Sequence, residues 1–437
     1  MKISIKKKDL IYLYIGFIVS IFTISGQLLT YIMPSSTIRL FFITSIFFII
    51  FLIITQNYLV SDNKLFFNAI LLFCMGVYAF YNDDWWNLYN IFLYILILVL
   101  CFMSAYTYKW ITYFFYISLT AYIIYAICTI FFYFDSDLYL NKIVNLFPET
   151  KDKLIEWYNS GCMAGLTDHY STNAMFLTVG LIISFTGCAN LWKNKHLKLL
   201  LTLLFVITLL LTGKRGHIVF AIASLFALYY FSIKKEKGIN RGLKFIGIIL
   251  IIICLASILF PMIPALSVFI ERFQTAIDSG NISTNRVQIL WPLAIKGFKT
   301  SPLFGLGWCQ YTSTLSPQIV GPGTYYHAHN VYLQLLCDTG ILGFTIYITW
   351  MIKSLFSTLA NYKNIVENTS SNSLISYMAF SLGFQIFFLL YNFTGNALYD
   401  EEMYIPYFVA CAINIHYSFQ INKTPGFKDV KQGDGHK

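Results

Sequence analysis

The chain has 437 residues, of which 57% are hydrophobic and only 11% are charged. Soluble globular proteins are about 25% charged, so this balance excludes an ordinary soluble enzyme and a disordered protein. The net charge of +10 comes from basic residues scattered through short polar segments, and no single domain is basic, so we expect no nucleic-acid partner. The composition instead predicts an all-α membrane protein with about twelve transmembrane helices.

Each predicted span is an apolar stretch bounded by charged or turn residues. The first stretch follows Lys6, Lys7 and Lys8; it is too long for a signal peptide and lacks a cleavage site, so we expect an uncleaved span. The tenth is long, and Gly340 and Gly343 predict a break in it. In chain order the spans are 10–32, 38–58, 65–81, 88–106, 111–134, 165–190, 197–212, 217–233, 244–263, 330–360, 374–394 and 403–420.

These spans divide the chain into membrane segments and connecting segments. Residues 1–134, 165–263 and 330–420 hold the transmembrane helices. Residues 135–164 and 264–329 are long loops on one side, and 421–437 are a tail. Of the 30 lysines and arginines, 20 lie in the N-terminal segment, the tail and the loops on their side. Because basic residues accumulate in the cytoplasm, both termini are predicted to be cytoplasmic and both long loops to lie outside.

The larger outer loop, 264–329, contains patterns typical of short helices. Ser267–Ile277 is amphipathic, and Thr284 can cap a helix over Asn285–Phe298 that is kinked at Pro292. A glycine-rich turn follows at 305–307. We expect these helices to lie on the outer membrane face or to fold back over the spans.

Two arginines in the outward segments are candidates for chemistry. Arg215 lies in Leu211–Gly216, at the outer junction of two spans, and Arg286 lies beside Trp291 on the predicted outer helix. A guanidinium at the membrane edge is costly unless it is paired or functional. The alternatives are an interfacial anchor for Arg215 and a solvated helix charge for Arg286.

A third group precedes and enters the tenth span. His327 and His329 stand before Asn330, Gln334 and Asp338, which recur every four residues and share one helical face. A polar stripe on an apolar helix indicates a face turned toward protein or a water-filled cavity. The alternative for His329 is a capping or interfacial histidine.

Together these groups suggest a substrate. Two guanidiniums can hold a diphosphate, and a histidine can take a proton from a hydroxyl. A substrate that combines diphosphate, membrane and hydroxyl is a lipid-diphosphate-linked sugar. The cysteines lack metal-binding spacing, and the chain has no Walker motif, so we expect no metal and no cofactor.

The tenth span and three upstream segments resemble the O-antigen ligase and polymerase family. The main resemblance is His329–Gln334, followed by Asp338, Gly340-Ile341 and Gly343. The upstream pieces are Leu211–Gly216, similar to a Thr-x-Ser-Arg-Gly segment; Arg286 with Trp291, similar to an outer-helix arginine; and Ser301–Gly307, similar to a Pro-x-x-Gly-x-Gly turn. The resemblance covers roughly residues 165–350, and the earlier spans agree only in hydropathy.

The resemblance implies a metal-independent glycosyltransferase with a C-type, many-helix membrane fold in the bacterial cytoplasmic membrane. Such enzymes move glycan from an undecaprenyl diphosphate donor to a glycan or lipid acceptor on the outer side, beside other polysaccharide-assembly membrane proteins. By the resemblance, Arg215 and Arg286 would bind the diphosphate, and His329 would be the general base. The accessory candidates are Asn330, His327, Asp338, His169 and Lys214, which stands where the family often has serine.

Two other classes remain open. A transporter or flippase of lipid-linked oligosaccharide would have ionisable residues midway through spans and an inverted repeat. Asp338 is the clearest residue of that kind, and no repeat is visible. A structural scaffold would not need the outward arginines. Polymerase and ligase share the residues above, and the outward loops lack an evident site for a lipid A core, which favours a polymerase.

Overall fold

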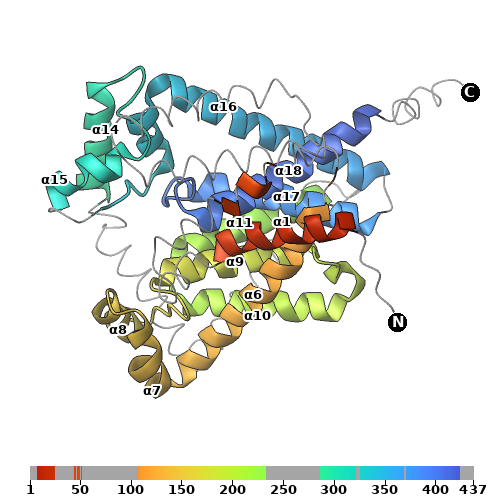
Figure 1. The fold of residues 1–437 in the computed structure, drawn as a ribbon, viewed down its shortest axis with the longest axis horizontal. Helices are drawn as coiled ribbons and strands as arrows, with labels where there is room; N and C mark the ends of the chain where they lie inside the picture. The colour runs from red at the N-terminus through yellow and green to blue at the C-terminus, as the bar shows by residue number, and fades with distance from the viewer. Residues whose placement is uncertain are drawn as a thin grey trace, which may run out of the picture.

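The computed structural model describes residues 7–24, 44–45, 47–49, 51, 107, 109–232, 286–320, 325–368 and 371–423. The described residues form helices, turns and loops, with no strand among them (Figure 1). The α-helices are α1 (Lys7–Ile24), α6 (Lys109–Phe134), α7 (Ser136–Leu138), α8 (Lys151–Asn159), α9 (Tyr170–Thr186), α10 (Lys195–Leu211), α11 (Arg215–Ser232), α14 (Trp291–Thr300), α15 (Pro317–Val320), α16 (Val331–Asn368), α17 (Asn372–Tyr391) and α18 (Glu401–Lys423). Short π- or 3₁₀-helical turns are η1 (Tyr139–Ile143), η2 (Val144–Leu146), η3 (Leu191–Lys193), η5 (Arg286–Leu290) and η6 (Tyr311–Leu315).

The helices confirm the all-α membrane class. By length and composition, α6, α11, α16 and α17 could each cross a membrane, and α1 and α9 are shorter apolar helices. The predicted spans 65–81, 88–106 and 244–263 lie outside the described residues, so the total of about twelve stays a prediction. Helix α9 is shorter than predicted because His169 caps its start and Gly187, with a positive φ of 82°, ends it.

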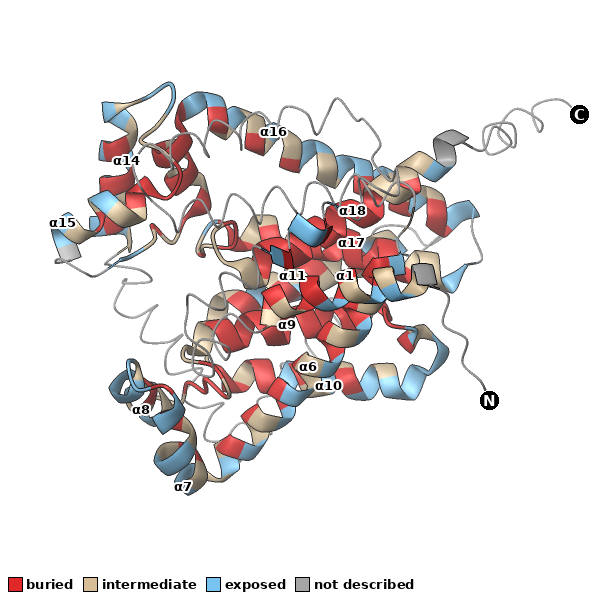
Figure 2. Cartoon of the chain, in the orientation of Figure 1, coloured by how far each residue is buried: buried red, intermediate tan, exposed pale blue. Residues whose placement is uncertain are grey.

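The core lies where α17 packs against α9, α11, α16 and α18. Figure 2 shows α9, α17 and α18 mostly buried, whereas α11 and α16 also carry intermediate and exposed residues. Aromatic rings fill the contacts; for example, the ring centroids of Phe388 and Tyr407 are 4.1 Å apart. Peripheral α10 instead exposes leucines, among them Leu199 and Leu200. Such a surface suits lipid contact.

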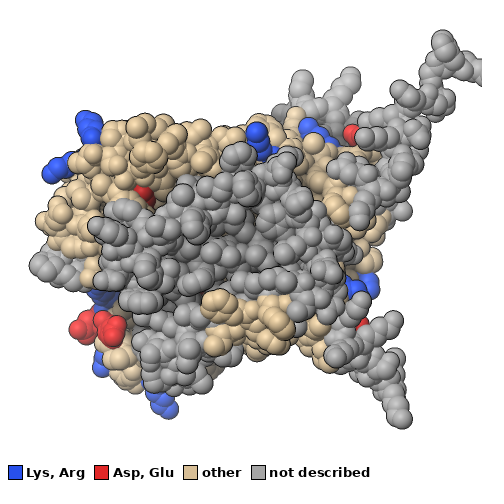
Figure 3. Space-filling model, turned by 45° about the horizontal axis from the view of Figure 1, so that its top comes forward, with Lys and Arg blue, Asp and Glu red and all other residues tan. Residues whose placement is uncertain are grey.

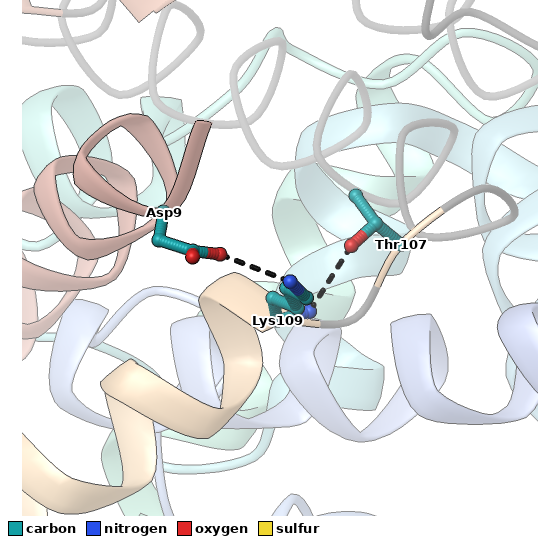
Figure 4. A network of polar contacts seen from close by, with 3 residues as sticks. All are labelled: Asp9, Thr107 and Lys109. Carbon is teal, nitrogen blue, oxygen red and sulfur yellow. Dashed lines mark hydrogen bonds and ion pairs between the residues drawn. The ribbon is translucent and has the colours of Figure 1, made fainter. Parts of the chain in front are cut away.

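Charged side chains gather at the margins. In Figure 3 the described lysines, arginines and acids lie at the edges of the face that is drawn. One pair joins the starts of α1 and α6: Lys109 Nζ lies 2.9 Å from Asp9 Oδ1, while the Lys109 backbone N–H donates to Thr107 Oγ1 (Figure 4). Because Lys109 is largely exposed, this pair contributes little to stability.

The described parts of both predicted outer loops lie at the same end of the bundle. Helices α7 and α8 lie at one corner of that end and α14 and α15 at the other, whereas α1 begins and α18 ends on the opposite side (Figure 1). This arrangement agrees with loops on one side and termini on the other. Which side faces the cytoplasm stays a prediction.

Helix α16 is broken, as predicted, at Gly340, where φ is 63°; Gly343 continues the helix. The loop 301–307 supplies the backbone partners that the break removes. Leu306 and Gly307 N–H groups donate to the carbonyls of Cys337 and Asp338, at 2.9 and 2.8 Å, and the Ile341 N–H donates to Pro302 O at 2.8 Å. Buried backbone groups need such partners, so the loop stabilises the break.

The predicted kinked helix over Asn285–Phe298 is wrong in one respect. The chain forms the π-helical turn η5 and then begins α14 at Trp291, so Pro292 lies in the first turn of a helix and not at a kink inside one. Proline lacks an N–H, and the first turn is where that N–H has no helical partner. Thr284 and Ser267–Ile277 lie outside the described residues.

Candidate functional site

The turn between α10 and α11 places two cations side by side. Helix α10 ends at Leu211, Gly213 adopts a positive φ of 65°, and α11 begins at Arg215. The Met163 N–H donates to Leu211 O at 3.0 Å, which ties the end of the outer segment 135–164 to this turn. Lys214 and Arg215 are both half-buried. Lys214 and Arg215 therefore lie at the same end of the bundle as the outer segment 135–164.

The turn that follows α17 brings three distant segments together. The Arg286 guanidinium donates from Nη1 to the Thr394 carbonyl at 2.9 Å. The Val331 N–H donates to Asn392 O at 2.9 Å. A Cβ built on Gly216 would lie 3.6 Å from Thr394 Oγ1. Residues 392–394 thus contact the starts of α11, η5 and α16.

Sequence reasoning missed this turn. In two of the three contacts the turn contributes a backbone carbonyl, and every residue type has one, so the sequence does not indicate these contacts. The available signal was the three polar residues Asn392, Thr394 and Asn396 at the end of an apolar span. Polar residues at a span end are common, so these three alone would have been a weak indication.

His329 lies at the entrance to α16 and has a positive φ of 50°, which is unusual for a residue other than glycine. The next residue, Asn330, caps the helix by accepting the Leu333 N–H at 3.1 Å. The His329 ring makes no hydrogen bond to another described residue. Burial lowers its pKa to about 3, and the charges of Arg286 and Lys214 act in the same direction. The imidazole is therefore neutral and close to both cations.

His327 is held differently. Its Nδ1 lies 3.1 Å from both Thr312 Oγ1 and Gln334 Nε2. Gln334 Oε1, which accepts the Ala328 N–H, also lies 3.3 Å from the same ring nitrogen. Burial lowers the pKa of His327 to about 4. His327 therefore lies in a structural network, whereas the His329 ring has no hydrogen-bond partner among the described residues.

The cations around His329 repel one another. Burial lowers the pKa of Arg286, and the charge of Arg215 adds to this effect. Burial and then the charge of Arg286 lower the pKa of Lys214 to about 8. Neither Lys214 nor Arg286 forms an ion pair with a carboxylate of the described chain. Half-buried positive charges without counter-ions are costly, and a bound anion would relieve that cost.

The other accessory candidates divide between the site and the scaffold. His169 lies near His329 and Lys214. Burial and then the charge of Lys214 lower the pKa of His169 to about 3. Its Nδ1 accepts the Ser171 N–H at 2.9 Å. Asp338 instead holds the loop before it: its carboxylate accepts the N–H groups of Cys309 and Tyr311. At Asp338 the polar stripe of α16 thus faces protein, which is one of the two environments predicted for it, the other being a water-filled cavity.

An apolar cavity of about 410 Å³ lies next to these groups. It opens between the two halves of α16, the end of α17 and the start of α14. Its lining is mostly aliphatic and aromatic, and comprises Trp291, Asn330, Tyr332, Leu333, Phe344, Ile348, Met351, Ile352, Leu389 and Phe393. Asn330 and Phe393 adjoin His329 and Thr394 in the chain, so the cavity borders the cation cluster.

Potential metal ligands do not cluster in the described part of the chain: no group of three or more His, Cys, Asp or Glu side chains could hold an ion there. No curated protein matches the chain significantly. A family model described as O-antigen ligase matches residues 200–348, which include Arg215, Arg286 and His329. The match confirms the resemblance drawn from the motifs. The match over residues 200–348 therefore supports an assignment to the O-antigen ligase family.

Proposed function

We propose that this protein transfers or polymerises glycan units from an undecaprenyl-diphosphate-linked donor onto an acceptor hydroxyl at the outer face of the cytoplasmic membrane. The family supports membrane glycan processing of the ligase or polymerase type. The observation that carries the finer proposal is the meeting of Arg215, Arg286 and Lys214 beside the ring of His329. O-antigen and capsular polysaccharide are the expected products.

The arginines would bind the diphosphate of the donor. Arg286 uses one N–H on Thr394 O, which fixes the guanidinium and leaves its other donors for a ligand. Arg215 lies close enough to repel Arg286, so one anion can contact both. Fixed cations of this kind stabilise the negative charge that develops as the diphosphate leaves.

His329 would take the proton of the acceptor hydroxyl as the acceptor oxygen attacks the anomeric carbon of the donor sugar. Without substrate, Arg286 and Lys214 help to hold the pKa of His329 at about 3, where it is a weak base. A bound diphosphate cancels these charges and raises that pKa toward the ordinary histidine value. Donor binding would therefore activate the base, which limits reaction in an empty site.

The apolar cavity would take the first isoprene units of the carrier lipid. Its lining offers aliphatic and aromatic side chains, and its polar edge at Asn330 adjoins the base. A polyprenyl chain gains free energy from burial in such a surface, roughly 25 cal/mol per Å². The diphosphate would then lie between the cavity and the outer loops.

Purified protein tests the proposal in a membrane mimic. With a lipid-diphosphate glycan and an acceptor glycan, the wild type should release the lipid diphosphate and lengthen the acceptor, whereas Arg286→Ala and His329→Ala should do neither. Lys299→Ala and His196→Ala are matched controls, because both residues are exposed and lie outside the cluster. Movement of intact donor across vesicles without release of lipid diphosphate would favour the flippase alternative.

The acceptor decides between polymerase and ligase. The same reaction run with a second lipid-linked repeat unit or with a lipid A core shows which one is extended. We propose the polymerase, because the sequence of the outward loops suggests no dedicated site for a lipid A core. Extension of the core alone would make the enzyme a ligase.

A further inference from the structure

Lys214 is positioned by aromatic rings. Its Nζ lies 4.8 Å from the centroid of the Tyr170 ring. Tyr170 stacks on His169, with centroids 4.7 Å apart and planes 18° apart, and Trp157 packs edge-on against His169 at 4.4 Å. Trp157 comes from α8, so the outer segment 135–164 supports the lysine. The negative face of an aromatic ring attracts an ammonium, so the Tyr170 ring favours the charged form of Lys214.

The charge of Lys214 is not compensated by a nearby acid. Asp400 is the carboxyl that acts on it, but burial and the charge of Glu402 raise the pKa of Asp400 well above its usual range. This shift favours the neutral form of Asp400 over the carboxylate. The two nearby guanidiniums, of Arg286 and Arg215, are also positive. The cluster thus holds three cations beside one neutral histidine.

This charge exceeds what the bound donor needs. A sugar diphosphate ester of a lipid is a diester and carries two negative charges. When the bond from the anomeric carbon to the phosphate oxygen breaks, its electron pair stays on that oxygen, and the lipid diphosphate carries a third. The two positive charges of the arginines equal the two negative charges of the donor. The third positive charge, of Lys214, equals the additional negative charge of the leaving group. A site complementary to the later state favours the transition state over the bound substrate.

We propose that Lys214 is a catalytic residue whose ammonium neutralises the charge that appears on the leaving phosphate oxygen. This inference rests on the proposed function. The acceptor oxygen forms the new bond to the anomeric carbon, and its proton goes to His329. The electron pair of the broken bond goes to the phosphate oxygen, and Lys214 stays protonated and pairs with it. Tyr170 is a positioning residue, because it acts only through the lysine.

Binding of two probes tests this assignment without an acceptor. Farnesyl diphosphate is a monoester with the charge of the leaving group, and a farnesyl-diphospho-sugar is a diester with the charge of the donor. Wild-type protein should prefer the monoester by about 10- to 100-fold, the size of one charge-assisted hydrogen bond. In Lys214→Met this preference should fall to within about threefold, and Lys214→Arg should retain most of it.

Transfer rates provide a second readout. Lys214→Met should lower kcat about 100-fold, as loss of one charge-stabilising donor does, with little change in KM for the donor. Tyr170→Leu should give a smaller loss of both kcat and the monoester preference. Lys193→Met is the matched control: this exposed lysine lies 5.3 Å from the Trp192 ring before α10, at the other end from Lys214, and its loss should change neither.

The variants separate the two claims. Full monoester preference in Lys214→Met would overturn the role of Lys214, and the proposed function would stand if Arg286→Ala had weakened both probes. Binding of both probes by Arg286→Ala at wild-type strength would overturn the proposed function itself. Lys214→Met removes an unpaired, partly buried charge, so its thermal unfolding in detergent should match that of the wild type or occur at a higher temperature.

Discussion

Gly305, in the outer loop, and Gly340, at the break in α16, lie where the backbones of the loop and the helix are in close contact. A Cβ on Gly305 would lie 2.4 Å from the carbonyl carbon of Asp338, and a Cβ on Gly340 would lie 2.4 Å from that of Leu303. Both glycines have positive φ angles, of 73° and 63°. Each therefore meets a backbone that cannot move aside, in a conformation that other residues rarely adopt.

Gly305→Ala and Gly340→Ala should each destabilise the protein by about 2 kcal/mol or more, through strain at a positive φ and a clash with backbone. Thermal unfolding in detergent measures this loss. Gly216→Ala is the matched control, because its Cβ would have no neighbour closer than 3.6 Å. Equal unfolding temperatures for Gly340→Ala and Gly216→Ala would contradict the interlock.

Asp338→Asn should lower stability by about 1–3 kcal/mol. The carboxylate accepts the Tyr311 N–H on Oδ1, and the Cys309 N–H and Tyr399 hydroxyl on Oδ2. An asparagine has one acceptor oxygen, so its amide group would face a buried donor. Tyr399→Phe removes a single partner and should cost less. A variant with normal unfolding but no glycan transfer would instead indicate that Asp338 takes part in the chemistry.

Variants of His329 and His327 should differ in their transfer rates. His329→Ala should reduce the rate by about 10²–10⁴-fold, the usual contribution of a general base. His327→Gln should keep the rate within about tenfold, because glutamine can still pair with Thr312 and Gln334. The reverse order of losses would transfer the base role to His327.

The pH dependence of His329 should respond to its neighbours. Its pKa lies near 3, so the ring stays neutral and reactive toward diethylpyrocarbonate down to about pH 5. Removing a positive charge favours the protonated ring and raises this pKa. In Arg286→Gln the reaction of His329, followed by peptide mass spectrometry, should therefore begin to slow at a higher pH than in the wild type. Identical profiles would show that Arg286 does not act on the ring.

The apolar cavity should discriminate donors by chain length. Ile348→Trp fills part of the lining and should raise KM for a long polyprenyl donor, while a donor with a very short chain should be unaffected. Phe356→Trp lies on α16 but outside the lining, and should change neither value. Equal KM values for the long donor in both variants would mean that the lipid binds elsewhere.

Sequence reasoning found the helices because long apolar runs can satisfy their backbone in lipid only as helices. It also located the break at Gly340, where a glycine interrupts such a run. It misplaced Pro292, since a proline inside a helical pattern fits a kink or a first turn equally well. Part of the site could also be predicted from the sequence. Its charged and aromatic side chains were candidates, but the carbonyls of Asn392 and Thr394 were not.

The spacing of His327 and His329 could not rank them as bases. Their difference arises from Gln334, one turn into α16, whose side chain reaches back to His327 and to the Ala328 N–H. Such a contact depends on the path of the chain through the positive φ at His329. A sequence does not reveal that path, because residues other than glycine adopt it only under tertiary constraint.

The break in α16 joins the loop before it and the helix into one hydrogen-bonded unit. Residues 301–311 bond to both sides of the break: Leu306 and Gly307 donate to Cys337 and Asp338, and Pro302 and Leu303 accept from Ile341 and Leu342. Grafting between homologous enzymes should therefore succeed only when the donor sequence replaces 301–342 as one piece. A graft that exchanged the loop or the half-helix alone would mismatch hydrogen bonds that must form together.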